Sequence, residues 1–283
     1  MVSCLFATDL HGHSDRYEKL FRAVQERPPR ALFLGGDLLP HFARKQDVPD
    51  DFLGEYLTPR LESLRATMGE RYPRVFVIMG NDDLRIEERK VQKIAERGLW
   101  QYAHLRRLEL DGYPVYGYAC VPPTPFLLKD WEKYDVSRYT PPGSVSPEEG
   151  RRTVPVEPRE ARHSSIADDL QTLVGDDDLS EAVLLFHTPP HDTALDRVAT
   201  DGKMIDHVPL DLHVGSIAVR RLIETRQPLV TLHGHIHEST RLTGKWRDRI
   251  GRTHMFNAAH DGPELALVRF DLEKAGDARR ELL

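Results

Sequence analysis

The chain has 283 residues, of which 40% are hydrophobic and 30% are charged, so it is long enough to bury one sizeable core. Its formal net charge of -6 excludes a global basic field of the kind that holds a long nucleic acid. No apolar run approaches the ~20 residues of a membrane span, and the first residues predict a strand rather than a signal peptide. We therefore expect a cytoplasmic protein without a membrane partner, whose oligomeric state the sequence does not indicate.

Short apolar runs predict buried β-strands along the chain, and polar residues follow several of them directly. The predicted strands are residues 2–7, 31–34, 75–79, 182–186 and 229–232. Polar side chains at the carboxyl ends of parallel strands converge on one crevice. The sequence therefore predicts a site that is built from the Asp, His and Asn residues that follow these strands.

Helical stretches alternate with the first of these strands. Predicted helices run from residue 14 or 15 to 25, from 50 or 51 to 70, from 84 to 97, from 162 or 164 to 173 and from 216 to 226. Residues 103–110 and 115–119 flank Asp111 and Gly112, a pair that is typical of a β-hairpin turn. A β-α-β half followed by a more antiparallel half predicts an α/β fold.

A segment rich in proline, residues 121–163, interrupts this alternation. So many prolines exclude a long helix, because proline lacks the N–H group and its ring clashes with the preceding turn. A long irregular loop within a compact domain is usually either a lid or disordered. Since aromatic residues occur in its first half, we expect a lid over the predicted site, inserted into a single domain that spans residues 1–283.

The polar residues after the strands are of metal-binding types. They are Asp9, His11, Asp37, Asn81, His187, His235 and His237. Imidazoles mixed with carboxylates and one amide suit manganese, which we expect first, or iron, zinc, cobalt or nickel, whereas calcium and magnesium prefer oxygen ligands. Without a thiolate, a structural zinc site is excluded, and we expect Cys4 and Cys120 to be buried. So many ligands exceed what one ion takes, so we expect two divalent ions bridged by a shared carboxylate.

The order of these residues matches a known family. The motifs are Asp9-Leu10-His11, Gly36-Asp37, Gly80-Asn81-Asp82-Asp83, His187 and Gly234-His235-Ile236-His237. This series resembles the calcineurin-like metallophosphoesterases over residues 1–271, and the runs at 187–190, 213–216 and 235–239 resemble a less characterised prokaryotic branch of them. The resemblance implies a four-layer α/β/β/α sandwich with mixed sheets and a metal site at the strand carboxyl ends.

The resemblance also assigns roles within the site. It places Asp9, His11 and His237 on one ion, and it places Asn81, His187 and His235 on the other ion. Asp37 would bridge the two ions. The activity it implies is hydrolysis of a small phosphate ester by a hydroxide that bridges the metals.

One position departs from the family pattern. Asp82 stands where many members have a histidine that protonates the leaving group. Either another histidine, His213 or His191, takes over this role, or the leaving groups need little protonation, or the activity is weak. An anion at the start of the predicted helix 216–226 would find free N–H groups beside His213. We therefore predict Asp82, His191 and His213 as catalytic residues.

Further residues are predicted to contact or orient the substrate. His13 is interpreted either as a phosphate contact or as a residue before a helix, and Asp83 as either a helix N-cap or an acceptor that orients the site. Lys129 would meet a phosphate if the proline-rich segment folds over the metals. Trp131 and Tyr134 would stack on a base or an apolar leaving group, or else would pack the loop onto the core.

Three functions remain open at this stage. Without the family's leaving-group histidine, we favour phosphodiesters such as cyclic nucleotides or nucleotide-like diesters. The first alternative is a phosphomonoesterase or a phosphoprotein phosphatase. The second is a non-catalytic interaction module that metal ions stabilise, and Asp82 is the sequence feature in its favour.

Overall fold

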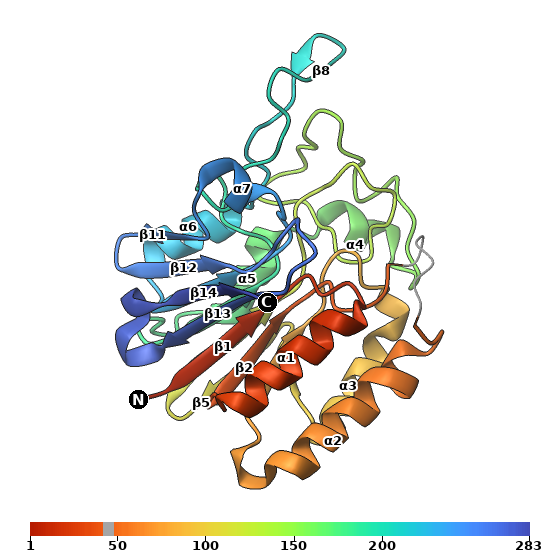
Figure 1. Ribbon diagram of the computed structural model, residues 1–283. Coiled ribbons are helices and arrows are strands. Elements are labelled where there is room, and N and C mark those ends of the chain that lie inside the picture. Colours follow the sequence, from red (N-terminus) through yellow and green to blue (C-terminus); the bar gives the residue numbers. More distant parts are fainter. Residues whose placement is uncertain (42–47) are drawn as a thin grey trace.

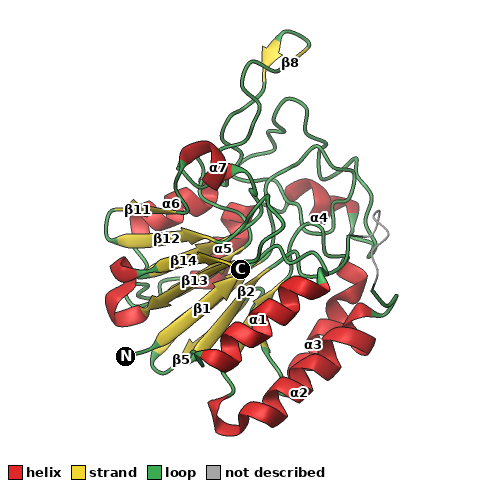
Figure 2. Ribbon diagram, viewed as in Figure 1, coloured by secondary structure: helices red, strands yellow, loops and turns green. Residues whose placement is uncertain are grey.

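Two six-stranded sheets lie at the centre of the structure, a computed structural model that describes residues 1–41 and 48–283. The sheets pack against each other, with β2 contacting β7 and β3 contacting β6. Helices cover the outer face of each sheet, so that the layers follow the order α/β/β/α (Figures 1 and 2). The mixed α/β sandwich predicted from the sequence motifs is confirmed.

The first sheet has the order β14-β13-β1-β2-β3-β4. Its parallel strands are β1 (Ser3–Ala7), β2 (Ala31–Gly35), β3 (Arg74–Ile78) and β4 (Gln101–Tyr102). Two antiparallel strands complete it, β13 (Ala266–Asp271) beside β1 and β14 (Arg279–Leu282) at the edge. Every residue of β2 is buried, as expected for a parallel strand covered on both faces.

The second sheet has the order β11-β12-β10-β7-β6-β5. Its inner strands, all parallel, are β6 (Tyr113–Tyr118), β7 (Val183–Phe186), β10 (Val230–His233) and β12 (Thr253–Asn257). Only the edge strands, β5 (Arg106–Leu110) and β11 (Arg247–Ile250), run antiparallel. The second half of the chain is nevertheless more antiparallel than the first, as predicted, because β5 and β6, β11 and β12, and β13 and β14 pair antiparallel, whereas β1 to β4 pair in parallel. Helical crossovers lead from β6 to β7 and from β7 to β10, and such crossovers join parallel strands.

The helices lie close to their predicted positions. On the first sheet they are α1 (Ser14–Glu26), η1 (Phe52–Leu57), α2 (Thr58–Met68), η2 (Gly69–Arg71), η3 (Arg85–Glu87) and α3 (Glu88–Glu96). On the second sheet they are α5 (Ile166–Val174) and α6 (Ile217–Arg226). The remaining elements are α4 (Pro158–His163), α7 (Ser239–Thr243), η4 (Leu272–Asp277) and the small hairpin of β8 (Met204–Ile205) and β9 (Val208–Pro209).

The predicted β-hairpin is also found, as β5 and β6. Asp111 and Gly112 have φ of 50° and 92°, so both residues of the turn adopt the left-handed backbone that such hairpins need. Cys4 and Cys120 are buried free cysteines, as expected. Within residues 1–41 and 48–283, no helix combines the length and the apolar character needed to cross a membrane.

The proline-rich segment, residues 121–163, is irregular until α4 begins near its end. Backbone hydrogen bonds fasten its first half: Val121 N–H donates to the Trp131 carbonyl at 2.9 Å, and Lys133 N–H donates to the Val121 carbonyl at 3.1 Å. Ile166 N–H then donates to the Tyr134 carbonyl at 2.8 Å. The first half of the segment is thus an ordered loop that is tied to itself and to the start of α5.

Candidate active site

The predicted metal ligands all follow strands of the two sheets. Asp9 and His11 follow β1, Asp37 follows β2 and Asn81 follows β3, while His187 follows β7 and both His235 and His237 follow β10. Several of these turns hold a non-glycine residue in the left-handed region, with φ of 55° at Asp9, 47° at His11, 50° at Asp37 and 70° at His235. Such a conformation costs on the order of 1–3 kcal/mol and concentrates at functional sites.

A first group of ligands surrounds one point. Asp9, His11, Asp37 and His237 each offer an atom, and these atoms lie within 4.8 Å of one another. Nε2 of His11 lies 3.2 Å from Nε2 of His237, and Nε2 of His237 lies 3.0 Å from Oδ1 of Asp9. The group matches the first predicted ligand set with Asp37 added.

A second group adjoins the first through Asp37. Nε2 of His187 lies 3.3 Å from Oδ2 of Asp37 and 3.0 Å from Oδ1 of Asn81. The rings of His187 and His235 lie 5.2 Å apart, centroid to centroid. Asp37 therefore lies between the two groups, the position that a bridging carboxylate requires.

The donor set fits divalent cations. Asp9 and Asp37 are buried, and among the described residues their ion pairs involve only histidines. Although burial alone would raise the pKa of the Asp9 carboxyl, His237 holds that pKa below its usual value, so the group is ionised. Burial lowers the pKa of His235 to about 3, so this imidazole is neutral, the form that binds a metal. Buried carboxylates without Lys or Arg partners, facing imidazole nitrogens, are a site for a positive ion.

Asp83 holds two of the ligand-bearing loops together. Its buried carboxylate accepts hydrogen bonds from Leu38 N–H at 2.9 Å, Leu39 N–H at 2.8 Å and Gly80 N–H at 2.9 Å. The N-cap interpretation is wrong, because the helical turn that follows, η3, begins at Arg85 and has Leu84, not Asp83, at its N-cap position. Asp83 instead fastens the loop that carries Asp37 to the loop that carries Asn81.

Gly80 gives a direct test of how tightly this site is packed. A Cβ atom at Gly80 would lie 2.3 Å from Oδ1 of Asp37 and 2.6 Å from Cε1 of His187. We expect Gly80→Ala to lower the metal content and the turnover together, because the methyl group displaces two ligands. Gly276→Ala is the control, because φ there lies outside the left-handed region and a Cβ atom would come no closer than 3.4 Å to its nearest neighbour, His254. Metal analysis and thermal melting check this, and normal metal content in Gly80→Ala would contradict the assigned ligands.

Asp82 lies beside the first group of ligands. Its N–H donates to Oδ1 of Asp37 at 2.8 Å, and its Oδ2 lies 3.7 Å from Nδ1 of His11. Nε2 of His41 lies 3.9 Å from the same oxygen, so His41, which no sequence motif marks, also borders the site. Burial and the nearby Asp37 raise the pKa of Asp82 to about 7. Asp82 therefore lies beside His11 and Asp37, and its catalytic role stays a prediction.

His213 and His191 share a buried carboxylate that the sequence analysis did not single out. Nδ1 of His213 lies 2.7 Å from Oδ1 of Asp196, and Nδ1 of His191 lies 3.8 Å from Oδ2 of the same residue. Asp196 is fully buried and also accepts Gly215 N–H at 3.1 Å. No motif marks Asp196, because only the folded loop brings it to His213.

The start of α6 is not open to a substrate anion. The Asp135 carboxylate accepts hydrogen bonds there from Ile217 N–H at 2.6 Å, Ala218 N–H at 3.2 Å and the Ser216 hydroxyl at 2.6 Å. The predicted anion contact at this helix end is therefore wrong, since a side chain of the protein occupies the N–H groups. His213 itself remains exposed enough to reach a ligand, with 31% of its side chain accessible.

A cavity of 430 Å³ adjoins the metal ligands. Its lining includes His191, His213 and His235, so it joins the two histidines on Asp196 to a predicted metal ligand. A volume of this size lies within the range of small-molecule sites. The cavity is therefore large enough for a small organic molecule and borders one of the predicted metal ligands.

Two residues predicted to contact substrate are enclosed in the loop. The Lys129 ammonium is buried, lies 2.5 Å from Oε2 of Glu132 and donates to the Thr124 carbonyl at 2.9 Å. The Trp131 ring is 1% exposed and its N–H donates to the Asp83 carbonyl at 2.8 Å. Both side chains are thus buried in contacts within the protein, so the prediction that they contact the substrate is wrong. The sequence did not reveal this, because an irregular loop has no periodic pattern that distinguishes buried from exposed side chains.

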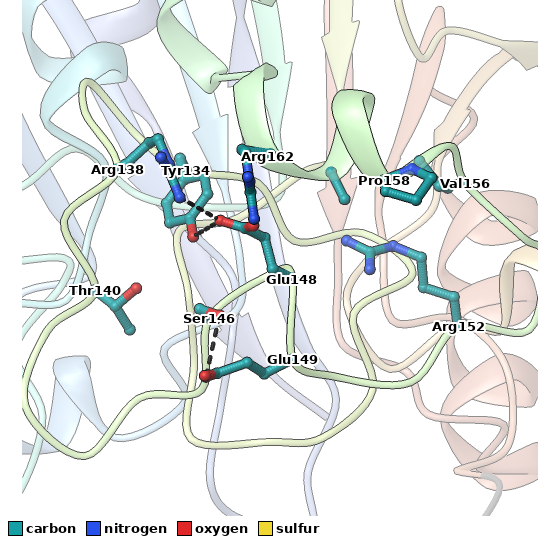
Figure 3. Close-up of a pocket in the computed structure, with 11 residues that line it drawn as sticks. Tyr134, Arg138, Thr140, Ser146, Glu148, Glu149, Arg152, Val156, Pro158 and Arg162 are labelled. Atoms are coloured by element: carbon teal, nitrogen blue, oxygen red, sulfur yellow. Dashed lines mark hydrogen bonds and ion pairs between the residues drawn. The ribbon is translucent and has the colours of Figure 1, made fainter.

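Tyr134 is also buried, and its hydroxyl faces a different cavity. That cavity has a volume of 820 Å³, and none of the predicted metal ligands is among the described residues that line it. Figure 3 shows the Tyr134 hydroxyl and the Arg138 guanidinium converging on the Glu148 carboxylate, at 2.9 Å and 2.7 Å. His13, the remaining predicted contact, is exposed at the start of α1.

The fold and this cluster of nitrogen and oxygen ligands define a metal-binding protein of the metallophosphoesterase type. The chain belongs to the family of calcineurin-like phosphoesterases, whose family model matches residues 3–239. This membership confirms the resemblance drawn from the motifs and supports a metal-dependent phosphoester hydrolase. The chain matches none of the curated proteins compared with it.

Solved structures show the same fold. One crystal structure aligns with 99% of this chain and 98% of its own, with a TM-score of 0.61 at 19% sequence identity. The crystal structure of TT1561 of Thermus thermophilus aligns over 99% and 98%, with a TM-score of 0.57 at 17% identity. At these identities the similarity shows a shared fold alone.

Proposed function

We propose that this chain hydrolyses phosphodiesters with two divalent metal ions, manganese being the first expectation. The ions would be held by Asp9, His11, Asp37, Asn81, His187, His235 and His237. The diester preference rests on one observation: the Asp82 carboxylate lies beside the metal ligands, with Oδ2 3.7 Å from Nδ1 of His11, where many family members have a histidine. A phosphomonoester carries close to two negative charges at pH 7 and a diester carries one, so a carboxylate beside the phosphoryl group disfavours the monoester.

Residues of the protein itself would hold the general acid in place and supply the proton. When bound, the ions would lower the pKa of a water molecule and polarise the phosphoryl oxygens. In the protonated form of His213, the Nδ1–H group donates to Asp196, which fixes the ring, and the Nε2–H group can give its proton to the leaving oxygen and leave a neutral imidazole. His191 is the second candidate for this step, because it borders the same carboxylate and lines the same cavity.

A turnover assay tests the proposal directly. Protein reconstituted with manganese is given bis(p-nitrophenyl) phosphate or p-nitrophenyl phosphate, and the release of nitrophenolate is followed. We expect a higher kcat/KM on the diester. A higher value on the monoester would overturn the diester preference while leaving the phosphoesterase in place.

The interaction module makes a different prediction. A non-catalytic protein would bind its metal ions and turn over neither ester. The ligand atoms of Asp9, His11, Asp37 and His237 converge, and a cavity borders His235, so bound ions would have room for a substrate beside them, which favours the enzyme. Full metal content together with no turnover of either ester would contradict the proposal.

A further inference from the structure

The cavity of 430 Å³ has walls from two distant parts of the chain. One wall comes from residues 122–144, the first half of the proline-rich segment, and the other from residues 191–217, which follow His187. His235 and Ile236 form the border with the metal ligands. Any group that lies in this cavity is therefore adjacent to the site where the phosphoester would bind.

The walls are mainly apolar. Apolar lining residues from both segments include Pro122, Pro125, Val136, Val198, Val214 and Ile236. A concave, mainly apolar surface with a few polar groups is the usual form of a site for an organic ligand. Water leaves such a surface readily when an apolar group replaces it.

Two exposed aromatic rings lie in this lining, and they differ from the pair expected from the sequence. Phe126 is 58% exposed and Tyr139 is 64% exposed, whereas Trp131 and Tyr134 are buried. Exposed rings at the rim of an apolar cavity offer faces on which a flat ring stacks. Phe126 and Tyr139 thus replace Trp131 and Tyr134 as the candidates for stacking.

The charged residues that line the cavity disfavour an anionic group on the ring, in addition to the charge of the phosphoester. Among the described lining residues, none is Lys or Arg, and Asp211 and Glu238 are carboxylates. The third carboxylate, Asp135, already accepts hydrogen bonds from Ile217 N–H and Ala218 N–H at the start of α6. Away from the histidines of the lining, an anionic ring substituent would find carboxylates and neither Lys nor Arg.

We infer that this cavity binds the organic group of the substrate, and that this group is a flat, apolar ring system without a negative charge. The inference rests on the proposed function for its placement beside the phosphoester. Phe126 and Tyr139 act as the stacking residues at the rim, and the apolar walls enclose the ring. Substrates with a second phosphate or a carboxylate on the ring are excluded by charge.

Ring binding can be measured without turnover. The fluorescence of 1-naphthol is titrated with the manganese-loaded protein in saturating inorganic phosphate, which occupies the metal positions, and the titration is repeated with 1-naphthoate, which adds a carboxylate. We expect 1-naphthol to bind at least about tenfold more tightly than 1-naphthoate, since the cavity offers no cation to the carboxylate. Equal or tighter binding of 1-naphthoate would overturn the charge argument.

Variants at the rim test the stacking residues. Tyr139→Ala and Phe126→Ala should each weaken 1-naphthol binding by about fivefold or more, the lower end expected for loss of one stacked ring. Leu127→Ala is the matched control, because Leu127 is 55% exposed on the same loop and does not line the cavity. Melting temperatures should stay unchanged in all three variants, since these side chains are largely exposed.

The outcomes separate this inference from the proposed function. Ring binding that is lost in Tyr139→Ala or Phe126→Ala supports the cavity even if no ester is hydrolysed. Turnover of bis(p-nitrophenyl) phosphate with unchanged 1-naphthol binding in both variants, or with equal loss in Leu127→Ala, would reject the cavity while leaving the phosphoesterase intact.

Discussion

Replacement of Asp37 by Asn should remove bound metal and activity together. The carboxylate lies between the two ligand groups, 3.3 Å from Nε2 of His187 and 4.0 Å from Nε2 of His11. Asparagine keeps the shape and can still accept the Asp82 N–H bond to Oδ1, so the fold should persist. The lost negative charge should lower turnover by about 10²–10³, the scale of removing one electrostatic group from an active site. Metal titration followed by calorimetry, together with the diester assay, measures both effects.

His237→Ala is the control for Asp37→Asn. His237 contacts the first ligand group, through Asp9 and His11, whereas Asn81 contacts His187 in the second group. Loss of the His237 ring should therefore weaken mainly one ion. If Asp37→Asn also loses only one ion, or loses none, then Asp37 does not bridge the two positions.

Replacement of His213 by Gln should slow esters with poor leaving groups far more than esters with good ones. The ring is held by Asp196 at 2.7 Å and lines the cavity beside His235, so Nε2 is available to protonate a leaving oxygen. Loss of a general acid lowers the rate by about 10²–10⁴, while nitrophenolate esters, which leave without a proton, should change little. Rates on methyl and nitrophenyl diesters, with metal content measured in parallel, test the role.

Asp196→Asn distinguishes orientation from proton transfer. The amide retains the shape of the side chain and can still accept one N–H bond, yet it no longer carries the negative charge that holds His213 as an Nδ1–H donor. We expect a smaller loss than in His213→Gln, with the same dependence on the leaving group. Equal losses on good and poor leaving groups in both variants would assign these residues to substrate positioning. His191→Gln, measured in the same way, decides which of the two histidines acts.

The ligand positions could be predicted because the pattern that carries them is local. Each is a polar residue placed just after an apolar run, and the runs became β1, β2, β3, β7 and β10. Parallel strands that end at one edge of a sheet bring such residues together, regardless of the conformation of the other loops. For this reason Asp9, His11, Asp37 and His237 could be grouped without coordinates, and the structure places their ligand atoms within 4.8 Å of one another.

The cavity could not be predicted, because its features depend on long-range packing. Trp131 and Phe126 occur in the same irregular loop, and nothing periodic distinguishes the ring that is buried from the ring that is 58% exposed. The pairing of Asp196 with His213 joins residues seventeen positions apart across a loop, without a motif. The β5-β6 hairpin could be predicted from its turn residues, whereas the parallel order of the inner strands of the second sheet could not, since an apolar run does not encode its partner strand.

The metal content of the purified protein tests the central claim most directly. After removal of bound ions and reconstitution with excess manganese, elemental analysis should give two manganese ions per chain, because the ligands form two groups that share Asp37. The same analysis of Asp37→Asn serves as the reference for a damaged site. A wild-type protein that binds less than one metal ion per chain would contradict the account.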